Sequence, residues 1–141
     1  MIPIWYHISN MKLMNRNVDY AARALVFMAQ ANKPTVSVAQ MQEEVGVARP
    51  FLRKILQKLH KAGILQAVKG KGGGFALARN PENITLGDLV KALQGQIKLN
   101  DCVLRNKLCQ NHGTCKMRHK IAAIEIRLLA EIEGITIKDL L

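Results

Sequence analysis

The sequence predicts a mainly α-helical fold with a small β-hairpin wing: a winged helix-turn-helix followed by a long C-terminal helix. Three observations support this fold class. Residues 37–63 hold two short helical patterns joined by a tight turn, residues 64–78 hold two short apolar runs around a glycine-rich loop, and residues 116–133 repeat apolar side chains at helical spacing. At 141 residues, the chain suffices for one domain with an appendage.

The N-terminal part predicts a loose arm over residues 1–14 and then a helix. Asn17 can cap this helix, because apolar residues follow it at helical spacing until the Asn-Lys-Pro sequence at residues 32–34. We expect residues 15–80 to form the winged helix-turn-helix domain. Residues 81–141 are expected to hold the cysteine loop and the remaining helices.

The two helices of the helix-turn-helix have clear boundary signals. Ser37 and Gln40 form the pattern of a capping box, in which each side chain bonds to the other residue's backbone amide. Gly46 supplies the left-handed residue that ends the first helix. Pro50 suits the first position of the second helix, which Ala62-Gly63 closes.

A hairpin is expected directly after these helices, in the position of a wing. Residues 64–68 and 75–78 read as strands, and the loop Lys69-Gly70-Lys71-Gly72-Gly73-Gly74 joins them. Thr85, with Asp88 three residues later, is expected to cap the next helix. The segment from residue 96 to 115 reads as a loop, and the long helix over residues 116–133 follows it.

Positive charge is concentrated on the predicted winged helix-turn-helix. The formal net charge is +11, and residues 45–81 contain eight Lys or Arg and no Asp or Glu. Such clustering favours double-stranded DNA as a partner over the plainer alternative of a solvated lysine-rich face. Arg53 is expected to pair with two acceptors on guanine, whereas the lysines bind phosphate. The candidate DNA-binding residues are Arg49, Arg53, Lys54, Lys58, Lys61, Lys69, Lys71 and Arg79.

The three cysteines of the chain, Cys102, Cys109 and Cys115, lie in one polar loop. An odd number of thiols leaves one unpaired in any disulfide scheme, while thiolates are good ligands for an iron–sulfur cluster or for zinc. No base and orienting residue accompany them as in a cysteine enzyme, so an enzyme is not expected. With no export signal and no apolar run of roughly 18 residues, we expect a reducing cytoplasm and no membrane partner.

Four stretches resemble a family of winged-helix regulators that includes the iron–sulfur cluster regulator IscR and the nitric-oxide sensor NsrR. They are VDYAARALVFMA, RPFLRKILQKLHKAGILQAVKGKGGGFALAR, NITLGDLVKALQG and GITIKDLL, and the resemblance covers residues 11–141. It implies a transcriptional regulator, a repressor or dual regulator, that forms a homodimer through the long C-terminal helix. It also implies that a [2Fe–2S] or [4Fe–4S] cluster sets the affinity for operator DNA according to cluster supply, redox state or nitric oxide.

The same resemblance implies a set of cluster ligands. Cys102, Cys109 and Cys115 would be three of them. For the fourth, Asp19 matches an acidic residue of the first helix that the partner subunit supplies in nitric-oxide sensors. His119 lies one position beyond the histidine of cluster-assembly regulators, and His112 is a less favoured candidate.

Two positions of the predicted DNA-binding surface depart from this family. Arg53 stands where relatives often carry Glu, so we expect a different operator sequence. Lys69 stands where relatives often carry Arg on the wing. Because lysine lacks the planar fork of arginine, readout of the minor groove is expected to be weaker.

Overall fold

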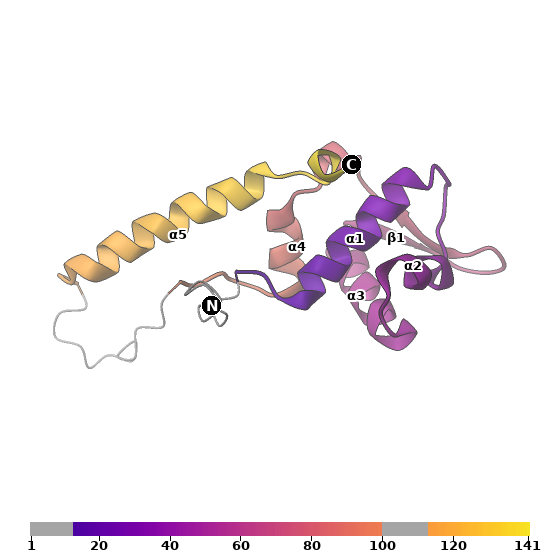
Figure 1. Ribbon diagram of the computed structural model, residues 1–141, viewed down its shortest axis with the longest axis horizontal. Helices are drawn as coiled ribbons and strands as arrows, with labels where there is room; N and C mark the ends of the chain where they lie inside the picture. Colours follow the sequence, from indigo (N-terminus) through magenta and orange to yellow (C-terminus); the bar gives the residue numbers. More distant parts are fainter. Residues whose placement is uncertain (1–12, 100–112) are drawn as a thin grey trace, which may run out of the picture.

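The computed structural model describes residues 13–99 and 113–141, within which the predicted winged helix-turn-helix is confirmed. Cys102, Cys109, His112 and nearly all of the predicted N-terminal arm lie outside the described residues. In these two ranges the helices and one hairpin follow each other, and two short 3-10 helices, η2 and η3, lie on either side of α4 and α5 in the sequence (Figure 1). The bounds are α1 Arg16–Gln30, α2 Val38–Val45, α3 Arg49–Lys61, β1 Leu65–Val68, β2 Gly74–Leu77, η2 Pro81–Asn83, α4 Leu86–Leu93, α5 Lys116–Gly134 and η3 Lys138–Leu140.

Helix α1 begins two residues earlier than the sequence indicated. Its N-cap is Asn15, not Asn17, and the Asn15 side chain accepts a hydrogen bond from the Val18 amide at 3.1 Å. The Asn15 amide in turn donates to Gln94 Oε1 at 2.8 Å. This contact with a residue 79 positions away decides between two asparagines that are equally good caps in sequence terms.

Helices α2 and α3 form the helix-turn-helix with the expected caps. The Ser37–Gln40 capping box is present, and Gly46 ends α2 in the left-handed conformation at φ 71°. Helix α3 begins at Arg49, so Pro50 is its second residue instead of its first, which is also a position where no backbone donor is lost. One face of α3 is buried against α1, α2 and α4 through Leu52, Ile55, Leu56 and Leu59.

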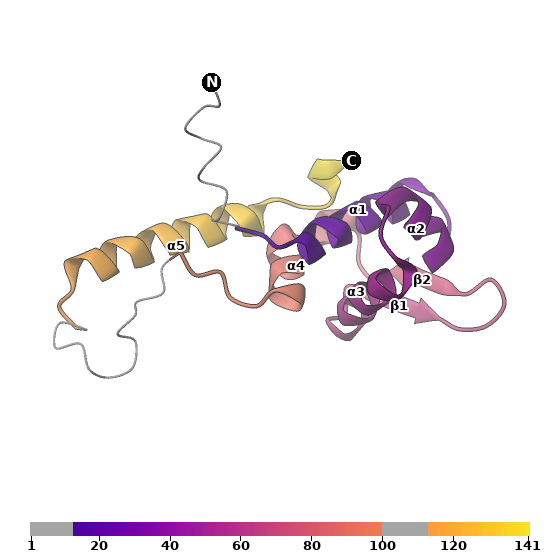
Figure 2. The ribbon, with the colours of Figure 1, turned by 60° about the horizontal axis from the view of Figure 1, so that its bottom comes forward.

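The wing is the antiparallel hairpin β1–β2, with Leu65 opposite Leu77 and Val68 opposite Gly74. It extends away from the helices, with its turn as the outermost point (Figure 2). A bridge between Val36 and Phe75, with both N···O distances 2.9 Å, attaches β2 to the segment before α2. Gly74 permits this approach, because a Cβ atom there would collide with the Val36 carbonyl.

Helix α4 and the C-terminal residues pack on the helix-turn-helix instead of forming a separate core. The Thr85–Asp88 capping box is present at the start of α4, as predicted. After α5 the chain returns to α4: the Leu86 amide donates to the Ile135 carbonyl at 2.9 Å and the Ile137 amide to the Ile84 carbonyl at 2.8 Å. Ile137 is fully buried in the same cluster as the core of α1–α3. One buried cluster therefore includes side chains from both sides of residue 80, and the division of the chain there stays a prediction.

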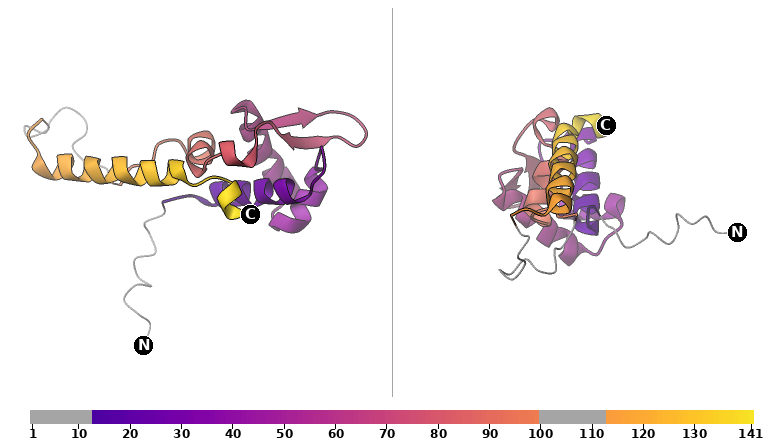
Figure 3. Two further views of the ribbon diagram at one scale, coloured as in Figure 1. Left: turned by 90° about the horizontal axis from the view of Figure 1, so that it is seen from above. Right: turned by 90° about the vertical axis from the view of Figure 1, so that its left-hand side faces the viewer.

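Helix α5 extends away from the other described helices. Its C-terminal end contacts α4, and its N-terminal end lies far from α1, α2 and α3 (Figure 3). Of the apolar stripe that the sequence predicts here, Ile132 is buried, whereas Ile124 is 50% exposed and Ile126 is 69% exposed. The helix is as expected, and Leu128 and Leu129 pack partly against the core, but the described residues leave Ile124 and Ile126 largely uncovered. No helix among the described residues is long and apolar enough to cross a membrane.

Candidate nucleic-acid interface

The outer face of α3 carries polar side chains at intervals of one turn. Arg49, Arg53 and Gln57 are four residues apart, so they lie along one line on the helix, and all three are exposed. They line an open hollow of about 480 Å³ together with Pro50 and Lys54. Sequence reasoning missed Gln57 because it carries no charge. Its position one turn after Arg53 is the signal that identifies it as part of this face.

The start of α3 and the wing share a second hollow, of about 270 Å³. Arg49 and Arg53 form its α3 side, Val68 and Gly70 belong to its wing side, and Ser37 contributes from the start of α2. The two arginines thus lie where α3 meets the hairpin.

Seven of the eight candidate residues carry charge without an acidic partner in residues 13–99 and 113–141, where no ion pair to them is found. All seven are exposed: Arg49, Arg53, Lys54, Lys58, Lys61, Lys69 and Lys71. Lys69 and Lys71 lie in the wing turn, where Gly70 and Gly72 have positive φ. Unpaired exposed cations on a protruding helix and turn attract phosphates without first breaking an internal ion pair.

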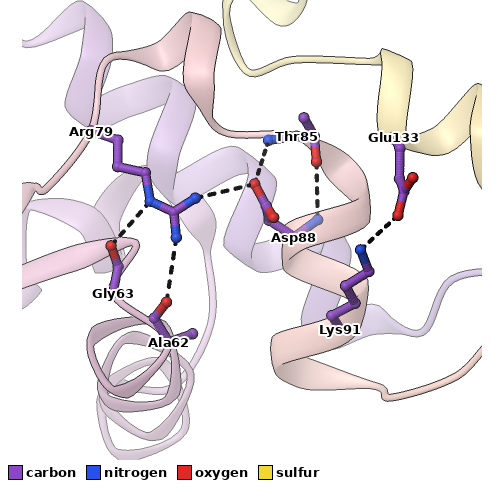
Figure 4. A network of polar contacts seen from close by, with 7 residues as sticks. All are labelled: Ala62, Gly63, Arg79, Thr85, Asp88, Lys91 and Glu133. Carbon is purple, nitrogen blue, oxygen red and sulfur yellow. Dashed lines mark hydrogen bonds and ion pairs between the residues drawn. The ribbon is translucent and has the colours of Figure 1, made fainter.

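Arg79, the eighth candidate, is already engaged within the chain. Its Nε atom lies 3.3 Å from the Gly63 carbonyl oxygen, its Nη2 atom 3.4 Å from that of Ala62, and its Nη1 atom 3.5 Å from Asp88 Oδ2 (Figure 4). The first two partners end α3 and the third caps α4. A contact of Arg79 with DNA stays a prediction, but the guanidinium has other partners in this structure.

A second ion pair connects α4 to α5. Lys91 Nζ lies 2.6 Å from Glu133 Oε1, and this hydrogen bond, together with the charge of Glu133, raises the pKa of Lys91. Both side chains are well exposed, so the pair contributes little to stability. The ion pair shows where α4 and α5 come into contact.

Cys115 is the described member of the cysteine set, and it is the N-cap residue of α5. It is partly buried and forms no side-chain cap bond. His119, one turn later, has Nε2 3.2 Å from the Gly113 carbonyl oxygen. Cysteine sulfur at a helix N-terminus fits the chemistry of an iron–sulfur ligand.

Asp19 lies in the first turn of α1, and α1 lies away from the N-terminal end of α5 (Figure 1). Its Oδ2 atom is 3.2 Å from Arg23 Nε, one turn along the same helix, and both side chains are more than half exposed. One chain therefore does not bring Asp19 to Cys115. The prediction that it serves as a ligand requires the α1 of a second subunit, as the sequence resemblance implied.

The helix-turn-helix, the basic outer face of α3 and the adjoining wing define a winged-helix DNA-binding protein. The sequence profile of the Rrf2 family, described as iron-dependent transcriptional regulators, matches residues 14–141. The chain belongs to this family of DNA-binding transcriptional regulators, whose members are not enzymes.

Individual relatives agree with this assignment. The chain is 30% identical to the transcriptional regulator NsrR of Bacillus subtilis over 132 residues, which cover 92% of this chain and 90% of that protein. Among solved structures, IscR of T. potens is 25% identical with a TM-score of 0.70 and covers 94% of this chain and 88% of its own. CymR, the global cysteine regulator of B. subtilis, is 19% identical with a TM-score of 0.73, covers 92% and 96%, and shows the shared fold.

Proposed function

We propose that the chain regulates transcription by reading operator DNA with α3 and the wing of each subunit of a homodimer. The observation that carries this proposal is the common position of Arg49 and Arg53, which line both the α3 hollow and the hollow shared with the wing. Arg53 is the base-reading residue, since a guanidinium can bond to two acceptors of guanine in the major groove. Lys54, Lys58 and Lys61 on α3, with Lys69 and Lys71 on the wing, hold phosphates.

Two substitutions at Arg53 separate base reading from charge. Arg53→Lys keeps the positive charge and removes the fork, while Arg53→Ala removes both. Binding is measured by fluorescence anisotropy on operator fragments selected from a random pool and on unrelated DNA. If Arg53 reads a base, both variants lose affinity for the selected site and relax one base position. Wild-type affinity of Arg53→Lys at the selected site would leave Arg53 with an electrostatic role only.

We further propose that Cys102, Cys109 and Cys115 hold an iron–sulfur cluster. The polar thiol-rich segment, the position of Cys115 at the start of α5, and the likeness to NsrR and IscR support it. Such a cluster, when bound, supplies chemistry that responds to oxidants or nitric oxide. The protein residues have simpler tasks: the thiolates bind, and Asp19 or His119 completes the ligand set. Zinc bound by the same thiols is the second candidate, because three cysteines and a histidine are a common structural zinc set.

Metal analysis of protein purified without oxygen distinguishes these candidates. Iron and acid-labile sulfide with visible absorption support the cluster, and colourless protein with stoichiometric zinc supports the alternative. Cys115→Ser should reduce the bound metal, with Thr114→Ser as the neighbouring control. Asp19→Asn and His119→Gln then identify the fourth ligand, because the one that is a ligand shifts the absorption spectrum.

The homodimer is proposed to form through α5. Ile124 and Ile126 are at least half exposed on it, and Met117 is 66% exposed, so the helix presents more apolar surface than a lone chain would favour in water. Light scattering should give a dimer for the wild type and a monomer for Ile124→Glu. Arg127→Glu, a charge change on the same helix, is the control. An unchanged dimer in Ile124→Glu would show that Ile124 is outside the interface.

A further inference from the structure

Arg79 bridges two helix ends that are far apart in sequence. Its guanidinium donates to the carbonyls of Ala62 and Gly63 after α3 and to the carboxylate of Asp88 in the first turn of α4 (Figure 4). Arg79 is followed by the η2 turn that leads to α4, so one side chain holds together the elements on either side of the hairpin. The three contacts use each of its three nitrogens once.

The end of α3 is shaped to receive a cation. The Ile64 amide donates to the Leu59 carbonyl and the Gly63 amide to the His60 carbonyl, both at 3.0 Å, which is the Schellman pattern of a helix C-terminus. Gly63 has the left-handed conformation, with φ 73°, and a Cβ atom added to it would lie 4.0 Å from Arg79 Nη2. A positive charge beside the negative end of the α3 dipole is favourable.

The start of α4 provides the opposite charge. Asp88 Oδ2 accepts from the Thr85 amide at 3.1 Å and also from Arg79, so one carboxylate oxygen caps α4 and binds the guanidinium. Along this line the α3 C-terminus is negative, Arg79 positive, Asp88 negative and the α4 N-terminus positive. Each neighbour attracts the next, and the row fixes the end of α3 relative to α4.

We propose that Arg79 is a positioning residue that orients α3 for DNA, and that it is not a phosphate ligand. The inference rests on the proposed function, in which α3 reads the operator. A phosphate on Arg79 would have to approach the carboxylate of Asp88, which repels it. In contrast, the lysines of α3 and the wing have no such acidic neighbour in the described part of the chain.

The substitution Asp88→Asn separates the two roles of Arg79, because they predict opposite changes in operator affinity. Asparagine keeps an oxygen for the Thr85 amide but removes the charge that holds Arg79. If Arg79 positions α3, removal of this acid weakens operator binding, although loss of negative charge near DNA ordinarily strengthens it. Arg79→Gln should weaken binding about three- to tenfold, because its contacts are partly exposed and long. The slope of log affinity against log salt concentration should stay as in the wild type.

The full-length dimer is titrated with selected operator DNA at several salt concentrations, and circular dichroism gives the unfolding midpoint of each variant. Lys138→Gln, on the C-terminal η3 turn, is the control for loss of one positive charge and should bind as the wild type. The double variant Arg79→Gln/Asp88→Asn should have about the same operator affinity as whichever single variant binds less tightly, since the two residues act as a unit.

Two results would overturn the inference. A salt slope lowered by about one in Arg79→Gln, with unchanged or tighter binding in Asp88→Asn, would make Arg79 a phosphate ligand. A lowered unfolding midpoint with wild-type affinity would make it a stabilising residue only. Arg53→Ala is included to test the premise: if it binds the selected operator normally, the proposed role of α3 fails, whatever Arg79 does.

Discussion

Helix α4 lies close to α5 at Gly87. A Cβ atom added there would lie 2.6 Å from Glu133 Cγ and 3.3 Å from Glu133 Cα. Carbon atoms pack best at about 3.5–4.0 Å, so Gly87→Ala requires either that the two helices separate by roughly 1 Å or that the Glu133 side chain rotates. Either movement disturbs the 2.6 Å ion pair between Glu133 and Lys91.

The expected cost of Gly87→Ala follows from two opposing effects. Overpacking of this kind costs about 1–3 kcal/mol. Alanine also favours a helix over glycine by up to about 1 kcal/mol, less in the first turn where Gly87 lies. The net loss is therefore about 1–2 kcal/mol, which for a chain of this size lowers the unfolding midpoint by about 3–8 °C.

The assay is thermal and urea unfolding of Gly87→Ala in two backgrounds. In the wild-type background it should destabilise. In Glu133→Ala the nearest obstructing atom is gone, so the same substitution should become neutral or slightly stabilising. Glu131→Ala, an exposed residue of the same helix, serves as the control background, and there the loss should persist.

A particular result would refute the reasoning about this crossing. If Gly87→Ala were as stable as the wild type while Glu133 is present, either α4 and α5 would not be held at this distance or the Glu133 side chain would rotate at no cost, and the expected destabilisation would be refuted. A loss of equal size in the Glu133→Ala background would instead place the clash on another atom.

Other expectations concern single residues. Arg53→Ala should cost about 1–3 kcal/mol at the selected operator and relax one base position, as measured by anisotropy. Lys69→Ala should reduce the salt slope of DNA binding by about one, and an unchanged slope would remove Lys69 from the phosphate contacts. Leu52→Ala should lower the free energy of unfolding by about 2–5 kcal/mol, because this side chain is fully buried. Hydrogen bonds from Thr136 lower the pKa of Asp139 below its ordinary value of 3.8, so its contribution to stability is present above pH 3.8 and disappears as the pH falls through the lower, folded-state pKa. The difference in free energy of unfolding between Asp139→Asn and the wild type should therefore become smaller in acid. A difference that stays constant down to pH about 2 would contradict this.

The sequence predicted a helix boundary correctly where the capping interaction involves residues only a few positions apart. Ser37 with Gln40, and Thr85 with Asp88, need only the residues between them to form a capping box, and both are present. The cap of α1 was missed because the choice of Asn15 depends on Gln94, which only the folded chain brings near. The range of the interaction, more than its strength, decided what was predictable.

The candidate site shows the same division. The charges on α3 and the wing could be identified from sequence because helical spacing places them on one exposed face. The partners of Arg79 could not, since they come from the end of α3 and the start of α4. The sequence placed Gly74 in the loop between the strands, whereas in the structure it begins β2 and its lack of a Cβ admits the Val36 carbonyl. On α5 the spacing predicted the apolar side chains but could not say that the described residues bury Ile132 and leave Ile124 and Ile126 exposed.

The attachment of α5 has a mechanical consequence. The helix has 19 residues and is therefore about 28 Å long, and hydrogen bonds of residues 135 and 137 tie its C-terminal end to the start of α4. Halfway along the helix, Glu125 Oε1 also accepts from the Leu99 amide at 2.7 Å. If the helix pivots at its C-terminal end as a rigid rod, a displacement of about 3 Å at Cys115 corresponds to a tilt of about 6° and moves Glu125 by about 1.5 Å. A displacement of the Cys115 end therefore either breaks the hydrogen bond to Leu99 or moves the segment that follows α4 together with the helix.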